Sequence, residues 1–211
     1  MSTDSWLDDT RASYDTVAES YTEIVAPMFD AEPHLRAALA VFAEQVGPGA
    51  PVADVGCGPG YATAHLHGLG LNASGVDLSP GMIDVARRKY PGITFDVGSM
   101  TDLKAADETL AGIVAYWSLI HIPDDVLPQV LQQFRRVLRP GGRLLVGFHV
   151  GTDSTLKTEG YGGHPMKVHV HRREPDAVAD LLHGNGFTVD TKTLLGLGER
   201  LPGAILHARR Q

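Results

Sequence analysis

Cysteine is nearly absent from this sequence, and long apolar runs are missing altogether. The one cysteine among 211 residues, Cys57, excludes an internal disulfide and a metal site built from several thiolates. No stretch approaches the roughly 18 consecutive apolar residues that a membrane span needs. The opening MSTDSWLDDT is acidic and has neither the basic nor the apolar region of a signal peptide. We therefore expect a soluble, cytosolic protein.

Positive charge is also scarce over the first two thirds of the chain. Residues 1–134 carry six basic and 18 acidic side chains, whereas residues 135–211 carry 12 basic and seven acidic ones. Nucleic acids are bound mainly through Lys and Arg at their phosphates, and no basic run here exceeds three residues. The composition, 43% hydrophobic with a formal charge of −7, instead predicts one globular domain that binds neither nucleic acid nor membrane.

Short apolar segments typical of buried strands alternate with segments of helical periodicity. Residues 11–46 have apolar side chains at helical spacing, interrupted by Pro27 and Pro33, which predicts two or three helices before the core. Five strands joined by helical or coil crossovers then predict an α/β fold with a doubly wound, mostly parallel sheet. The predicted strands are residues 51–55, 73–77, 93–97, 112–117 and 143–149, and the predicted helices are residues 60–69, 80–90, 124–138 and 174–184.

The last part of the chain changes this pattern. Residues 187–193 and 204–208 look like two strands without a helix between them, which predicts a C-terminal antiparallel hairpin and seven strands in all. Between residues 149 and 174 the sequence is rich in Gly and His and has no clear period. We predict a loop there, with a short strand at about residues 166–171, lying over the strand ends where ligands of such sheets bind.

A glycine-rich turn, DVGCGPG at residues 54–60, follows the first predicted strand and opens the next helix. Glycines allow unusual backbone dihedrals and a close approach by a ligand, while the helix start offers free N–H groups. Asp77 ends the second predicted strand, 17 residues after Gly60, where an acid can accept hydrogen bonds from both hydroxyls of a ribose. The two features together predict a site for a nucleoside-type cofactor.

The glycine spacing separates two kinds of cofactor. A dinucleotide fingerprint is G-x-G-x-x-G, whose third glycine lets the helix pack closely around a pyrophosphate. This chain has G-x-G-x-G, and Pro59 removes one N–H donor. An NAD(P)-dependent oxidoreductase therefore stays open as an alternative.

Five ordered segments over roughly residues 50–150 resemble the successive motifs of class I S-adenosylmethionine (SAM)-dependent methyltransferases. They are DVGCGPG, GVDLSPGMI, GSMTDL, AYWSLIHIP and RVLRPGGRLLVGFH; YDTVAESY and GGHPMKVHVH look more loosely like segments of small bacterial relatives. The resemblance implies a Rossmann-like fold, SAM as cofactor and S-adenosylhomocysteine as product. It implies methyl transfer to an O, N or C atom of a small molecule, and a non-catalytic SAM-binding module is a further alternative.

The resemblance also implies a division of one domain, residues 1–211, into three parts. Residues 1–48 would form a helical lid, residues 49–150 the cofactor-binding core, and residues 151–211 an acceptor-side loop with the closing hairpin. Aromatic side chains and histidines near the strand ends favour a phenol, an amine or an indole-like ring as acceptor.

Roles of individual residues follow from the same resemblance. Asp54 would hold the amino group of SAM directly or through water, and Asp77 the ribose. Many family members have an acidic residue at the adenine amino group where this chain has Gly98-Ser99, so we place that contact on Ser99 or on the backbone. The expected residues are Gly56, Gly58 and Gly60 at the methionine part and Leu78, Met82, Ser99 and Met100 at the adenine.

Aromatic side chains are expected near the sulfur. Trp117, with Tyr116, ends the fourth predicted strand, where it either attracts the positive sulfonium or packs in the core. Tyr14 and Tyr21, seven residues apart, share a helix face that either closes over the cofactor or anchors an amphipathic helix.

Histidines supply the candidate bases. His121 follows the fourth predicted strand, and its imidazole either acts as a general base or orders the SLIHIP turn. His149 ends the fifth predicted strand at the same edge. The candidate catalytic residues are His121, His149, Tyr14 and Tyr21, and the candidate acceptor-binding residues are Trp117, His121, His149, His164 and His169.

A metal site is not expected. His169 and His171 would project from one face of a strand, but a second pair of ligands with matching spacing is missing. We therefore assign these histidines to the lining of the acceptor pocket. Cys57 has no visible histidine partner, so we expect a small buried thiol.

Overall fold

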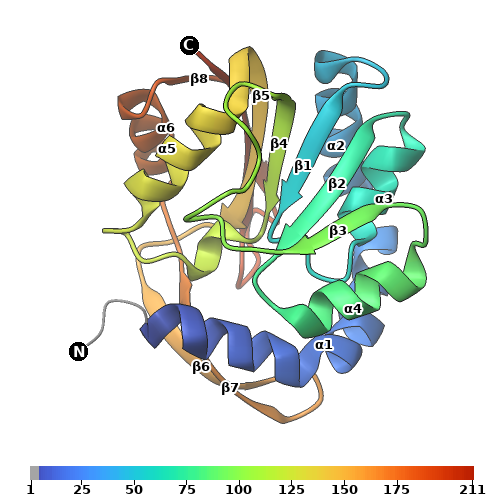
Figure 1. Ribbon diagram of the computed structural model, residues 1–211. Helices are drawn as coiled ribbons and strands as arrows, with labels where there is room; N and C mark the ends of the chain where they lie inside the picture. Colours follow the sequence, from blue (N-terminus) through green and yellow to red (C-terminus); the bar gives the residue numbers. More distant parts are fainter. Residues whose placement is uncertain (1–4) are drawn as a thin grey trace.

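The computed structural model describes residues 5–211 as an α/β sandwich around a seven-stranded sheet (Figure 1). The strand order is β3-β2-β1-β4-β5-β9-β8; the first five strands run parallel, and β9 is antiparallel to both of its neighbours. This confirms the predicted fold class and the C-terminal hairpin. The strands of this sheet are β1 (Pro51–Val55), β2 (Asn72–Asp77), β3 (Thr94–Val97), β4 (Leu110–Tyr116), β5 (Leu138–His149), β8 (Phe187–Leu195) and β9 (Gly203–Arg210).

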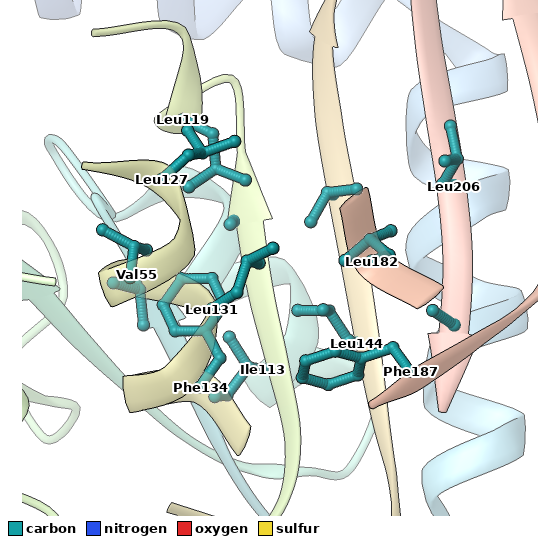
Figure 2. Packing of buried hydrophobic residues seen from close by; sticks show 14 of the residues in the cluster. Val55, Ile113, Leu119, Leu127, Leu131, Phe134, Leu144, Leu182, Phe187 and Leu206 are labelled. Carbon is teal, nitrogen blue, oxygen red and sulfur yellow. The ribbon is translucent and has the colours of Figure 1, made fainter. Parts of the chain in front are cut away.

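Helices cover both faces of the sheet, so the side chains of its central strands are buried on both sides. On one face, Phe134 and Leu131 of α5 pack beside Ile113 of β4 (Figure 2). Each such fully buried side chain contributes about 1.5–3 kcal/mol. The helices are α1 (Ser5–Ala31), α2 (Pro33–Val46), α3 (Tyr61–Gly68), α4 (Pro80–Lys89), the short 3₁₀ helix η1 (Leu119–His121), α5 (Leu127–Val137) and α6 (Pro175–Gly184).

The N-terminal segment forms two helices, and Pro27 does not interrupt the first of them. Pro27 lies inside α1, whereas Pro33 occupies the first position of α2. Phe29, two residues after Pro27, is buried and its ring packs against Tyr61 and Tyr116. This tertiary packing continues the helix past the proline.

The segment between β5 and α6 is a hairpin and not the predicted loop. β6 (Ser154–Gly160) pairs with β7 (His164–His171) in a separate two-stranded sheet. Only the second strand was predicted. Met166 and Val168 of β7 are buried against Val17 of α1, and Figure 1 shows α1 and the hairpin side by side across the carboxyl ends of the main strands.

α1 is fixed over this end of the sheet by polar contacts on both of its sides. Asp15 Oδ1 accepts hydrogen bonds from Ser79 Oγ (2.5 Å) and from the Gly81 N–H (2.9 Å) at the start of α4. Ser13 Oγ accepts from the Lys167 N–H of the hairpin (2.8 Å). No helix within residues 5–211 is long and apolar enough to cross a bilayer.

A matched pair of glycine substitutions tests the packing beneath the glycine-rich turn. Gly60 has φ +84°, and a Cβ there would lie 2.7 Å from Phe95 Cζ. We expect Gly60→Ala to lower the free energy of unfolding by roughly 1–3 kcal/mol through overpacking and backbone strain. Gly68→Ala, at the end of the same helix with open space around it, should cost nothing in a urea titration. Equal effects of the two substitutions would contradict the packing described.

Candidate functional site

A cavity lies at the carboxyl ends of β1, β2 and β4, beneath α1. It holds about 790 Å³ of space not filled by protein atoms, part of it open to solvent. Most of the residues assigned to the cofactor from the sequence line it. They are Tyr14, Tyr21, Asp54, Gly56, Gly58, Asp77, Leu78, Met82, Ser99, Met100 and Trp117, together with the candidate base His121.

The Asp77 carboxylate joins the glycine-rich turn to the β2–α4 connection. Its Oδ2 accepts a hydrogen bond from the Gly58 N–H (2.8 Å), and its Oδ1 accepts one from the Ser79 N–H (2.9 Å). Burial raises the pKa of Asp77, and these two backbone donors oppose that shift. Each carboxylate oxygen keeps a lone pair for a further donor. Over Gly58, where φ is +53°, a Cβ would meet only Tyr21 Cε1, at 4.0 Å, so the turn presents bare backbone to the cavity.

The other two glycines of the turn are needed for packing. Gly60 does not line the cavity, which differs from the prediction: its missing Cβ makes room for Phe95 and Ala86. Gly56 does line the cavity, but a Cβ there would lie 2.2 Å from Ser118 Cβ. Close packing of the turn against its neighbours therefore requires glycine at both positions.

Asp54 is a buried carboxyl group with one unsatisfied oxygen. Its Oδ2 accepts a hydrogen bond from Thr63 Oγ1 (2.6 Å), while Oδ1 is buried without a partner. Burial raises the pKa of Asp54 to about 7, and the Thr63 hydrogen bond opposes the shift. A buried acceptor without a donor is costly, so Oδ1 marks a position for a donor that enters the cavity.

Tyr14 and His121 form a hydrogen-bonded pair across the cavity. His121 Nδ1 lies 2.8 Å from the His169 carbonyl oxygen, which can only accept, so Nδ1 carries the proton. Nε2 then accepts from the Tyr14 hydroxyl at 2.6 Å. Burial lowers the pKa of His121 to about 4 and raises that of Tyr14, so both side chains are neutral at pH 7. The lone pair on Nε2 therefore faces a hydroxyl group on α1.

Trp117 is held in an unusual conformation at the end of β4. Its φ is +53°, and its ring fills notches at Gly147 and Gly203, where a Cβ would lie 2.6 and 2.9 Å from indole carbons. The indole Nε1–H points toward His149 Nδ1 at 3.3 Å. His149 therefore lies behind Trp117, outside the lining of the cavity.

The hairpin histidines also lie outside the cavity. His164 is exposed near α1 and α4. The His169 ring stacks on the His171 ring in an outer groove, with 5.9 Å between centroids, so the two do share a face. His169 reaches the site only through its carbonyl, which holds His121. Within residues 5–211, no three His, Cys, Asp or Glu side chains are placed to hold a metal ion, and Cys57 is a buried thiol whose pKa burial raises.

Sequence reasoning missed several residues that line the site or pack against its lining. Tyr61 follows the glycine-rich turn directly, and its hydroxyl lies 3.4 Å from that of Tyr21. The Tyr161 ring packs on Tyr21, with 4.7 Å between centroids. Five of the six tyrosines thus gather here, although only proximity to the turn could have indicated Tyr61. The remaining unpredicted lining residues include Trp6, Leu7, Ser118 and Ile122.

Comparison with known proteins points to one family. Residues 52–142 match the family model described as "Methyltransferase domain". The chain is 37% identical over 108 residues to the methyltransferase GfsG of Streptomyces halstedii, covering 48% of this chain and 38% of that protein. It is 30% identical over 156 residues to the demethylmenaquinone methyltransferase of Symbiobacterium thermophilum, covering 64% and 57%. The chain thus spans about half the length, or less, of these curated relatives.

The fold also matches a solved structure. This is the 1,6-didemethyltoxoflavin-N1-methyltransferase of Burkholderia thailandensis, described with 1,6-didemethyltoxoflavin and S-adenosylhomocysteine bound. The TM-score is 0.73 at 22% identity, covering 95% of this chain and 88% of that one. At this identity the match shows a shared fold.

The pairing of His121 predicts its protonation in solution. We expect nitrogen-detected NMR to show the Nδ1–H tautomer, with the ring neutral down to about pH 5 because its pKa is about 4. A folded-state pKa below the unfolded value means that the unfolded chain binds more protons between these values. The contribution of His121 to the free energy of unfolding is therefore fully present above pH 6.5 and is lost as the pH falls toward 4. An Nε2–H tautomer, or titration near pH 6.5, would contradict the pairing.

Proposed function

We propose that the protein is a class I SAM-dependent methyltransferase, an enzyme that transfers the methyl group of SAM to a small-molecule acceptor; residues 52–142 match the family model described as "Methyltransferase domain". The proposal rests on the charge of the cavity. Two carboxyl groups, Asp54 and Asp77, line it beside the glycine-rich turn, and none of the described lining residues is Lys or Arg. A pyrophosphate needs positive charge or many donors there. A ligand with an ammonium and a sulfonium group suits it better than NAD.

The side chains of the cavity fit the parts of SAM. The unsatisfied Oδ1 of Asp54 would accept from the amino group, and a positive group there would favour the ionised form of a carboxyl whose pKa is about 7. The remaining lone pairs of Asp77 would accept from the ribose hydroxyls. Leu78, Met82 and Met100 supply an apolar end for the adenine. The bare backbone at Gly58 leaves room for the chain between them.

The residues of this chain would orient the reactants and would accept the proton that the methyl acceptor loses. Bound SAM supplies a methyl group already activated by its sulfonium. α1 and the hairpin would exclude water from the cavity, and the cavity walls would hold the two reactants in line. An acceptor O–H or N–H would donate to Tyr14 Oη while the Tyr14 proton passes to His121 Nε2. The His169 carbonyl keeps the imidazole in the tautomer that can receive it.

We propose an aromatic or indole-like metabolite as the acceptor. The support is the ring-rich lining of Tyr14, Tyr21, Tyr116 and Trp117, which favours a flat partner. The relatives are named for unlike acceptors, demethylmenaquinone and 1,6-didemethyltoxoflavin, so they do not narrow the choice.

Calorimetry with SAM, S-adenosylhomocysteine and NADH tests the cofactor. We expect the first two to bind and NADH not to bind. Asp77→Ala should weaken binding by roughly 1–3 kcal/mol, because it removes an ionised acceptor of the ribose hydroxyls. Asp84→Ala, an exposed carboxylate on α4, is the matched control and should bind normally. NADH binding without SAM binding would replace the proposal by an oxidoreductase.

Rates of the chemical step test the Tyr14–His121 pair. We expect His121→Ala to slow methyl transfer about 100-fold or more, the usual size of general base catalysis, with little change in SAM affinity. Tyr14→Phe should lower the rate as well, because it breaks the path to Nε2. His67→Ala, exposed on α3, serves as the control. A wild-type rate constant in single turnover for His121→Ala would remove the pair from the mechanism.

A further inference from the structure

A largely buried arginine lies next to the short helix that carries the candidate base. Arg173 follows the β6–β7 hairpin, two residues after β7 ends, and only 10% of its side chain is exposed. It is not among the residues that line the cavity. Any effect of Arg173 on the reaction must therefore pass through another residue.

The Arg173 guanidinium holds the backbone carbonyls on both sides of His121. Its Nη1 donates to the Leu119 carbonyl oxygen at 3.0 Å, and its Nη2 donates to that of Ile122 at 2.5 Å. Nε and Nη2 also donate to Asp124 Oδ1, at 2.9 and 2.8 Å, and this carboxylate is exposed. A guanidinium that is removed from water needs acceptors for its N–H groups. Here each of its three nitrogens has one.

η1 has little support from its own hydrogen bonds. It is a single 3₁₀ turn, in which the His121 N–H lies 3.5 Å from the Ser118 carbonyl oxygen and the Ile122 N–H lies 3.1 Å from that of Leu119. Such turns have poor hydrogen-bond geometry, and the carbonyls at a helix end lack partners within the helix. The buried side chains of Leu119 and Ile120 attach η1 to the core. Apolar packing is not directional, so the orientation of η1 depends on hydrogen bonds from outside it.

The backbone of Arg173 is fixed as well. Its N–H donates to the His149 carbonyl oxygen, at the end of β5, at 3.0 Å. His169, whose carbonyl oxygen lies 2.8 Å from His121 Nδ1, is four residues earlier in the same segment. A two-stranded sheet is only marginally stable by itself, so its position depends on such attachments. Arg173 thus joins the end of β5, η1 and the strand that sets the His121 tautomer.

We propose that Arg173 is a positioning residue for methyl transfer, because it holds His121 against the His169 carbonyl in the tautomer that can receive a proton from Tyr14. This inference rests on the proposed function, since it takes the Tyr14–His121 pair as the proton acceptor. The planar guanidinium meets both η1 carbonyls at once, whereas the ammonium of a lysine is a single point charge. Once His169 no longer holds Nδ1, the proton can move to Nε2, which then cannot accept from Tyr14.

The tautomer of His121, read by nitrogen-detected NMR, tests this role without any methyl acceptor. We expect Arg173→Lys to lower the ratio of the Nδ1–H form to the Nε2–H form about fivefold, the factor that one hydrogen bond of ordinary net strength contributes. Arg136→Lys is the matched control. Arg136 also donates to two backbone carbonyls, those of Leu103 (2.6 Å) and Ala105 (3.0 Å), and to an exposed aspartate, but none of these lies in η1. The control should keep the His121 tautomer of the wild type.

A second pair of variants leaves the buried arginine in place. Asp124→Asn removes the exposed charge that orients the guanidinium, and it should lower the same ratio about twofold, the weight of one exposed ion pair. Asp125→Asn, at the neighbouring exposed carboxylate, is its control and should leave the ratio unchanged. Equal ratios in a variant and its control would overturn the proposal. The aspartate pair gives this answer even where Arg173→Lys fails to fold.

Calorimetry with S-adenosylhomocysteine separates this proposal from the proposed function. Arg173 does not line the cavity, so Arg173→Lys should bind S-adenosylhomocysteine as the wild type does. No binding by the wild type, with a His121 tautomer that still depends on Arg173, would refute the SAM site and leave Arg173 as a support of His121. Binding by every variant with an unchanged tautomer would refute the positioning role alone.

Discussion

The whole site depends on one carboxylate, that of Asp77, held between two backbone segments. Its oxygens accept from the Gly58 N–H at 2.8 Å and from the Ser79 N–H at 2.9 Å, so one side chain fixes both the glycine-rich turn and the start of α4. Burying an ionised acid is costly, and two backbone donors offset the cost. Ser79 in turn donates to Asp15, which carries the same constraint on to α1.

The candidate base exists only where three separate parts of the chain meet. Tyr14 comes from α1, His121 from η1, and the carbonyl that sets the His121 tautomer from β7. Contacts of Ser13 with the hairpin and of Asp15 with α4 hold these parts together. Moving α1 away would therefore open the cavity and separate the proton-accepting pair in the same motion. In the proposed mechanism, closure over the cavity and proton transfer would be coupled, because the hydrogen bonds involved join residues that are far apart in sequence.

Much of the cofactor-binding part of the site could be predicted from local sequence. The rest of the site depends on contacts between residues that are far apart in sequence. The strand at residues 51–55, the DVGCGPG turn and Asp77 are set by short-range periodicity and turn chemistry, and they lie where predicted. β6 was missed because its side chains are mostly exposed and show no apolar alternation. Gly60 was misplaced because its role depends on Phe95, 35 residues away. His149 ends the predicted strand, but the left-handed turn at Trp117 puts the indole in front of it.

A crystal structure with S-adenosylhomocysteine bound would test the account most directly. We predict both ribose hydroxyls within hydrogen-bond distance of the Asp77 carboxylate while its bonds to the Gly58 and Ser79 N–H groups persist. The amino group should meet Asp54 Oδ1, the buried acceptor that has no partner in the free protein. A nucleoside bound elsewhere, or an Asp77 that leaves its backbone donors to reach the ligand, would contradict the account.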